Sequence, residues 1–151
     1  MLREQINSVL KDAMKSGEKL KLSTLRLVNA AIKNADIEAR GGGKGPLDDA
    51  AVLSLLQKLI KQRQESAVLY EKGGRGELAA NELAEIKVIE GFLPKQMSDA
   101  EIEAAVKAAI AEAGATSVKD MGKVIGALRG KYAGQMDFGK ASGLVKSALA
   151  D

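Results

Sequence analysis

The sequence GFLPKQMSDAE, residues 91–101, divides this chain into two helical parts. Pro94 ends the helix before it, because the residue that precedes a proline is pushed out of the helical region of backbone conformations. Ser98 and Glu101 have the S-x-x-E spacing of a capping box, in which both side chains accept hydrogen bonds from amides at the start of a new helix. We therefore expect an N-terminal domain over residues 1–94 and a C-terminal domain over residues 95–151.

On both sides of this junction the apolar residues recur at helical spacing, and no sustained alternation of period two indicates a strand. The fold class predicted is all-α, with about four helices in the N-terminal domain and three short ones in the C-terminal domain. The expected N-terminal helices are one that ends before Gly17, one that begins near Ser23, a long one from a cap at Asp48 or Asp49 to about Lys72, and one from about Gly76 to Pro94.

Glycine and proline mark where these helices stop. The segment GGGKGPLDD, residues 41–49, is expected to be a flexible loop, since glycine is entropically costly in a helix and Pro46 lacks an amide proton. The apolar stripes predict the core. For the fourth helix the stripe is Leu78, Leu83, Ile86, Ile89 and Phe92 to Leu93, and for the last helix it is Phe138, Ala141, Leu144, Val145, Ala148 and Leu149.

Composition removes several classes of chemistry. The 151 residues include neither cysteine nor histidine, so disulfides, thiolate sites, histidine bases and the usual zinc sites have no ligands or bases to use. No cofactor, no metal site and no catalytic residue is predicted, and independent enzymatic activity is not indicated. Without an apolar run of about 18 residues or a recognisable signal segment, we expect a cytoplasmic protein that does not enter a membrane.

The stretch DMGKVIGALRGKYAG, residues 120–134, combines a helix start, an apolar stripe and excess positive charge. Residues 119–146 carry six cations against two anions, whereas residues 95–118 carry two cations against four anions. Such a local field attracts phosphate more effectively than the net charge of +3 on the whole chain, because salt limits the reach of each charge to about 10 Å. Lysine-rich helical faces are also common as plain solvated surface, and the charge pattern alone leaves both interpretations open.

Glycines accompany the cations in this stretch. Gly122 and Gly126 lie four residues apart on one expected helix, and Gly130 and Gly134 continue the spacing into the following turn. Small residues permit the close approach of another backbone, which is either a neighbouring helix or a phosphate chain reached by adjacent cations.

A second candidate site is a polar groove on the third expected helix and the turn after it. Its cations are Lys58, Lys61, Arg63 and Arg75. The fourth helix is acidic, and pairing of its Glu82 and Glu85 with Lys61, Arg63 or Arg75 would orient an antiparallel hairpin without implying chemistry. A solvated face remains the alternative. Two carboxylates one turn apart are a weak signal for a metal, because hard cations take six or more oxygen ligands.

Four separated motifs resemble the GatB/YqeY family over almost the whole chain. They are AMKSGEKLKLSTLRLVNAAIKNADIE (residues 13–38), KLIKQRQESAVLY (58–70), GRGELAANELAEIKVIEGFLPKQMS (74–98) and DMGKVIGALRGKYAG (120–134). The resemblance implies a stand-alone YqeY-like protein whose C-terminal domain is similar to the tail domain of GatB, a subunit of the glutamine-dependent amidotransferase that corrects misacylated tRNA. In that enzyme the tail contacts tRNA, and the catalytic parts lie elsewhere.

The family pattern implies contacts with nucleic acid through Lys123, Arg129 and Lys131, with Gly122 and Gly134 as backbone positions. After Gly134 the family often has a basic residue followed by aspartate, whereas this chain has Gln135, Met136 and Asp137. The sequence hypothesis is a non-catalytic protein that binds tRNA or another structured RNA, related by family to carbon-nitrogen ligases that use glutamine as the amide donor. The alternative is an adaptor for an amidotransferase or an aminoacyl-tRNA synthetase, which would use the groove.

Overall fold

The computed structural model describes residues 2–150, and its fold is all-α as predicted. Those residues form seven α-helices and one short 3-10 helix, with no strand among them. The chain divides into two compact units, the first ending at Leu93 and the second beginning at Pro94, within one residue of the expected boundary. The first unit contains α1 (Leu2–Ser16), α2 (Lys19–Gly41), α3 (Asp49–Lys72) and α4 (Gly76–Glu90). The second contains α5 (Asp99–Ala113), the 3-10 helix η1 (Val118–Asp120), α6 (Met121–Tyr132) and α7 (Phe138–Leu149).

The core of the first unit joins all four of its helices. Its buried side chains come from α1, α2, the first half of α3 and the second half of α4: Leu2, Ile6, Leu25, Val28, Ile32, Val52, Leu56, Ile60, Ile86 and Ile89. Burial of each such aliphatic side chain stabilises the fold by about 1.5–3 kcal/mol. This core therefore holds only the near halves of α3 and α4.

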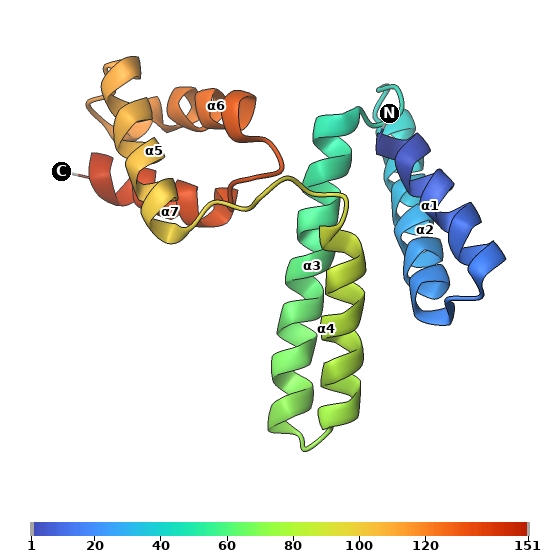
Figure 1. Ribbon diagram of the computed structural model, residues 1–151. Helices are drawn as coiled ribbons and strands as arrows, with labels where there is room; N and C mark the ends of the chain where they lie inside the picture. The colour runs from blue at the N-terminus through green and yellow to red at the C-terminus, as the bar shows by residue number, and fades with distance from the viewer. Residues whose placement is uncertain (1, 151) are drawn as a thin grey trace. The chain divides into compact units, whose positions relative to one another are not determined.

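The far halves of α3 and α4, about residues 63–85, form an antiparallel hairpin that extends beyond α1 and α2 (Figure 1). We call this hairpin the arm. Its buried apolar residues are the small Ala67 and Ala79. Between the two helices Arg63 Nε donates to Glu85 Oε2 at 2.8 Å, and the two side chains are 12% and 15% exposed. The arm therefore buries two small side chains and one ion pair that is largely buried.

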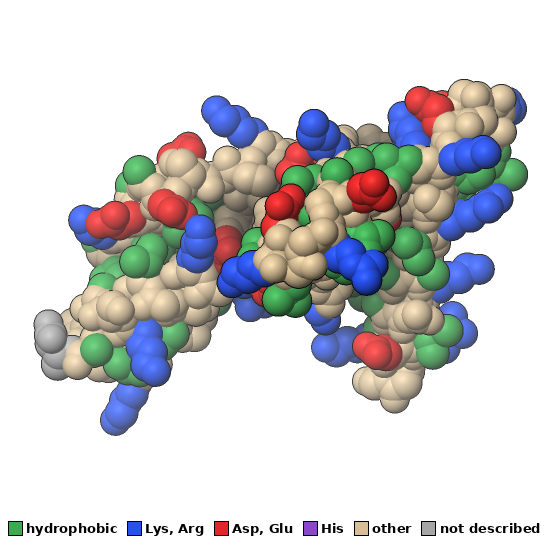
Figure 2. Space-filling view, turned by 90° about the horizontal axis from the view of Figure 1, so that it is seen from below, with side chains coloured by type: hydrophobic (Ala, Val, Ile, Leu, Met, Phe, Trp, Pro, Cys, Tyr) green, Lys and Arg blue, Asp and Glu red, His purple; other side chains and the backbone are tan. Residues whose placement is uncertain are grey.

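Two residues expected in the core of the fourth helix are exposed instead. Leu78 and Leu83 are 41% and 50% exposed, because along the arm α4 has α3 as its packing partner and cannot bury a wide apolar stripe. In the view along the arm from its free end, hydrophobic side chains reach the surface among acidic and basic ones (Figure 2). In the last helix Leu144 and Ala148 are also exposed, so the α7 stripe is narrower than predicted.

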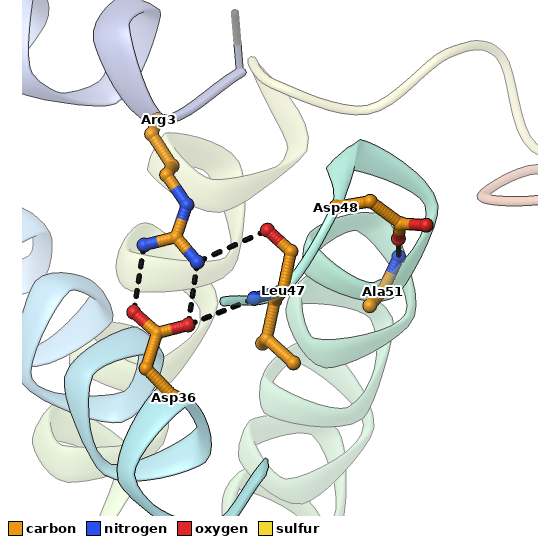
Figure 3. Close-up of polar contacts among 5 residues, drawn as sticks. All are labelled: Arg3, Asp36, Leu47, Asp48 and Ala51. Carbon is orange, nitrogen blue, oxygen red and sulfur yellow. Dashed lines mark hydrogen bonds and ion pairs between the residues drawn. The ribbon is translucent and has the colours of Figure 1, made fainter. Parts of the chain in front are cut away.

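The loop between α2 and α3 is tied to α1 by a polar cluster (Figure 3). Arg3 Nη1 donates to Asp36 Oδ2 at 2.8 Å, and Arg3 Nη2 reaches both Asp36 Oδ1 and the carbonyl of Leu47. The Leu47 amide in turn donates to Asp36 Oδ1 at 3.0 Å. Asp48 then caps α3, accepting from the Ala51 amide at 2.9 Å. Of the two candidates, Asp48 and Asp49, it is therefore Asp48 that caps α3. The loop is held in place at its C-terminal end.

Three helix boundaries differ from the prediction. Helix α2 begins at Lys19 and not near Ser23, because the hydroxyls of Ser23 and Thr24 donate to the carbonyl of Leu20 from inside the helix and do not cap it. It also runs on to Gly41, into the expected loop. Helix α4 ends at Glu90, four residues before Pro94, since the chain tightens after Glu90 into turns with i to i−3 hydrogen bonds.

The second unit has a core of its own, built from α5, α6 and α7. Its buried residues are Ile102, Ala105, Val106, Ala109, Val124, Leu128, Met136, Ala141, Val145 and Leu149. The predicted capping box is present, since the Glu101 amide donates to Ser98 Oγ and the Ser98 amide donates to Glu101 Oε1. Gly114 ends α5 in a left-handed conformation with φ of 63°, which an L side chain adopts only under strain.

Candidate nucleic-acid interface

The three predicted contact cations all lie on α6 and are exposed. Val124 and Leu128 turn one side of this helix into the core. At about 100° of rotation per residue, Lys123 and Arg129 lie on opposite sides of the exposed face, while Lys131, exposed in the last turn, lies on the same side of the helix as Val124. The helix therefore presents one cation on each side of its exposed face and a third at its C-terminal end.

The acidic residue at the start of α6 is engaged with backbone amides. Asp120 Oδ2 accepts from the Thr116 amide at 3.0 Å and the Ser117 amide at 3.3 Å. These two hydrogen bonds, with a smaller contribution from the charge of Lys123, hold the pKa of the Asp120 carboxyl below its ordinary value. Lys123 Nζ donates to the Ala113 carbonyl at 3.4 Å, at the C-terminal end of α5, where a cation is favourable.

Aromatic rings lie beside the other two cations. The Arg129 guanidinium is 5.4 Å from the centroid of the Phe138 ring, and Lys131 Nζ is 5.7 Å from that of Tyr132. These contacts limit the movement of both side chains and leave their charges at the surface. Sequence reasoning placed Phe138 in the apolar stripe of the last helix and did not predict that either ring lies beside a cation. The adjacency of Lys131 and Tyr132 was the available signal, but nothing local linked Arg129 to Phe138.

A strip without side chains runs along the exposed face of α6. Gly122, Gly126 and Gly130 recur every four residues, and no atom lies within 4 Å of the position that a Cβ would occupy on any of them. These glycines are therefore not explained by packing against a helix of the described chain. The strip lets a partner approach the α6 backbone closely between its cations.

Gly134 has a different place. It is buried in the turn after α6 with φ of 77°, and its carbonyl accepts from Gln96 Nε2 at 2.6 Å. The geometry explains this glycine by the turn, which needs a left-handed residue, and it lies outside the exposed strip. Contact between Gly134 and a nucleic acid stays a prediction from the family pattern.

Two other charged residues of the segment 119–146, Asp137 and Lys140, have hydrogen-bond or ion-pair partners. Asp137 accepts from the Gly139 and Lys140 amides and caps α7. Lys140 Nζ forms an ion pair with Asp99 at 2.9 Å, and this contact raises the pKa of the Lys140 ammonium. Within residues 2–150, by contrast, none of Lys123, Arg129 and Lys131 has a carboxylate within ion-pair distance.

The second candidate site is not assembled as one group. Lys58, Lys61 and Arg75 are exposed, with Lys58 and Lys61 on the same side of α3. Arg63 instead faces α4, where Glu85 accepts a hydrogen bond from its Nε, and its Nη1 donates to the Leu59 carbonyl on α3. The expected ion pair across the hairpin is present, and it takes Arg63 out of the predicted groove.

The described residues 2–150 contain no cluster of three or more acidic side chains placed to hold a metal ion. In the same range every buried side-chain nitrogen or oxygen has a hydrogen-bond partner. No helix there is sufficiently long and apolar to cross a bilayer.

Comparison with known proteins identifies the family of the chain. The family model described as "Yqey-like protein" matches residues 3–149. The chain belongs to the YqeY-like family. A YqeY-like relative from Lachancea thermotolerans is 36% identical over 105 residues, which cover 68% of this chain and 54% of that protein. A relative from Pyrenophora tritici-repentis is 32% identical over 132 residues, or 84% of this chain and 71% of that protein.

Both of these YqeY-like relatives carry the name altered inheritance of mitochondria protein 41, mitochondrial. An uncharacterised protein of Schizosaccharomyces pombe is 33% identical over 98 residues, covering 65% of this chain and 76% of that protein. The matched segment spans about half of the Lachancea protein. The family assignment covers both units, including α6 with its glycine strip and cations.

Proposed function

We propose that this YqeY-like protein binds structured RNA, with tRNA as the RNA suggested by the resemblance to the GatB tail. Its role is non-catalytic and accessory to glutamine-dependent amidation, and its binding surface is the exposed face of α6. The observation that carries this proposal is the combination of an unpacked glycine strip with three exposed cations that have no ion-pair partner among the described residues.

The binding mode follows from the side chains available. Lys123, Arg129 and Lys131 neutralise phosphates, and the glycine strip between them admits the ribose-phosphate chain close to the helix. The rings of Phe138 and Tyr132 are engaged with cations, which leaves them poorly placed to stack bases. Recognition therefore depends on the backbone and shape of the RNA, and discrimination between base sequences is weak.

Filling the strip tests the proposal without removing any charge. Gly126 is exposed and nothing packs against its Cβ position, so Gly126→Leu should add a large side chain at the surface that keeps the fold and blocks close approach. We expect the affinity for total tRNA, measured by fluorescence anisotropy, to fall about tenfold, because phosphate contacts on both sides of the strip lengthen.

The matched control is Gly143→Leu, which makes the same change at an open helical glycine of α7. This control should bind tRNA within about twofold of the parent protein. Equal affinities for both variants and the parent would overturn the assignment of binding to α6.

A second candidate function is favoured by the arm. Val68, Leu69, Leu78 and Leu83 are 52%, 69%, 41% and 50% exposed within one short helical hairpin. Exposed apolar side chains among charges of both signs suit a protein partner better than a polyanion. In this alternative the arm binds an amidotransferase or an aminoacyl-tRNA synthetase, with Lys58, Lys61 and Arg75 at the rim.

The two candidate functions respond differently to salt. Binding of RNA through several phosphates weakens steeply as salt concentration rises, while an apolar contact between proteins changes little. A Leu69→Ser, Leu83→Ser variant that loses binding to a purified amidotransferase or synthetase but keeps tRNA affinity would support the adaptor function.

A further inference from the structure

A cavity of about 620 Å³ lies in the first unit, where the middle of α1 and the start of α2 meet the end of α4. Its apolar lining comes from Val9, Leu20, Val88 and Phe92. This volume is within the range of small-molecule sites in proteins, and its mainly apolar surface with a few polar groups is also typical of them. The cavity does not involve α6 or any residue of the second unit.

The polar residues of the cavity carry a net positive charge. Lys19, Lys21 and Lys87 line it together with one acid, Glu18. The lysines come from two segments far apart in the sequence, and none of the three is in an ion pair within residues 2–150. Three unpaired ammonium groups beside an apolar floor are complementary to a ligand with a phosphate at one end and an aromatic or apolar group at the other.

Glu18 limits which ligands are complementary to the cavity. A carboxylate repels a bare anion, but it accepts hydrogen bonds from hydroxyl groups. One of its oxygens, Oε2, accepts from Ser16 Oγ at 3.0 Å, and the other has no hydrogen bond among the described residues. A ligand with hydroxyls between its phosphate and its apolar group can use both the lysines and Glu18, whereas the acyl chain of a simple lipid phosphate cannot.

We propose that this cavity binds a nucleoside monophosphate group, with the base against Phe92 and Leu20, the phosphate at Lys19 and Lys87, and the ribose hydroxyls near Glu18. Such a group occurs as a free nucleotide and as the end of an RNA chain. The first turn of α2 adds positive field to the same region, although the lysines attract phosphate without this contribution.

The first experiment titrates the full-length protein with the four nucleoside 5′-monophosphates at low salt, by isothermal calorimetry. We expect saturable binding of at least one of them. The matching nucleoside without phosphate and inorganic phosphate without nucleoside should each bind much more weakly, because each uses only one part of the cavity. Failure of all four nucleotides to bind, or equal binding of inorganic phosphate, would overturn the proposal.

Two variants test the location. Lys19→Ala with Lys87→Ala should weaken nucleotide binding about tenfold, the effect of losing two partly exposed charge pairs. Leu20→Ser should weaken nucleotide binding several-fold and leave the weak interaction with inorganic phosphate unchanged, a result that simple loss of charge cannot produce. Circular dichroism melting curves verify that both variants are folded.

The matched control removes two charges from a different cavity of the same unit. Arg26 and Lys33 line a cavity between α1 and α2, away from Lys19 and Lys87. Arg26→Ala with Lys33→Ala should keep nucleotide affinity within twofold. A larger loss in this control than in the Lys19, Lys87 variant would place the site elsewhere and overturn the proposal.

A further titration, with a 5′-phosphorylated trinucleotide and its dephosphorylated form, distinguishes a free nucleotide from the end of an RNA chain. Tighter binding of the phosphorylated trinucleotide than of the mononucleotide assigns the cavity to an RNA end, and the reverse order assigns it to a free nucleotide. A Lys123, Arg129, Lys131 alanine variant should bind mononucleotides as the parent does, so the outcome is independent of the proposed function of α6.

Discussion

At the scale of single residues, Asp36 accepts more hydrogen bonds than any other acidic residue of the first unit described above. Its two oxygens accept from Arg3, and one also accepts from the Leu47 amide. The hydrogen bond from Arg3, followed by that from Leu47, lowers the pKa of Asp36 from 3.8 to about 2. A single carboxylate therefore couples the start of α1, the end of α2 and the loop before α3.

This pKa shift predicts a dependence of stability on pH. Because the pKa is lower in the folded protein than in the unfolded chain, the stabilisation is complete above pH 4 and is lost as the pH falls from about 4 to about 2. Urea unfolding followed by circular dichroism at a series of acid pH values measures it. Asp36→Asn should be less stable than the parent at pH 7 and should lose less stability on acidification, whereas Asp12→Asn, at an exposed site on α1, should follow the parent.

In this fold Arg63 forms an ion pair across the arm with Glu85. Arg63→Ala leaves the largely buried Glu85 carboxylate without its ion-pair partner, and we expect the free energy of unfolding to fall by about 2 kcal/mol. Lys61→Ala, two residues away and exposed, should change it by less than about 0.5 kcal/mol. Equal effects of the two substitutions in chemical denaturation would contradict the assignment of Arg63 to the hairpin.

At the scale of elements, α6 combines glycines that the fold requires with glycines that it does not require. The turn after α6 needs Gly134, because φ is positive there. The helix itself would be more stable without Gly122, Gly126 and Gly130, since glycine is about 1 kcal/mol less favourable than alanine in a helix. Folding of the described residues therefore does not account for the strip, whereas the proposed contact with RNA does.

Alanine substitution distinguishes the two kinds of glycine. Gly126→Ala should raise the free energy of unfolding by about 0.5–1 kcal/mol, because nothing opposes the added methyl group and the unfolded chain loses freedom. Gly134→Ala should lower it by at least about 1 kcal/mol, because an L side chain at that φ is strained. Thermal melting of both variants gives the comparison, and a loss of stability in Gly126→Ala would mean that a side chain is not tolerated on this face.

Sequence patterns were sufficient for most of the elements. The capping box of Ser98 and Glu101 and the end of α3 at Lys72 depend on local chemistry, and both were predicted correctly. The start of α2 near Ser23 was predicted wrongly, because a hydroxyl can either cap a helix or donate to a carbonyl inside it. Only the tertiary structure selects between these two roles. The exposure of Leu83 and the position of Arg129 over Phe138 depend on which helices meet, information that a single stripe does not contain.

At the scale of the whole molecule, charge and apolar surface are divided between different parts of the chain. The net charge of +3 is small, yet residues 119–146 carry six cations against two anions. The arm instead carries exposed leucines among charges of both signs. Each unit has its own core, so a surface of one unit can be altered without removing a core residue of the other.

The most direct test of the RNA-binding account is the salt dependence of tRNA binding, compared between the parent and a Lys123→Ala, Arg129→Ala, Lys131→Ala variant. A Lys11→Ala, Lys33→Ala, Lys44→Ala variant serves as the control that removes the same charge from exposed sites in the first unit. We predict that the α6 variant loses affinity at low salt and that its slope of log affinity against log salt is shallower by about 2, while the control keeps most of the parent's affinity. Equal affinity and slope in the parent and the α6 variant would contradict the account.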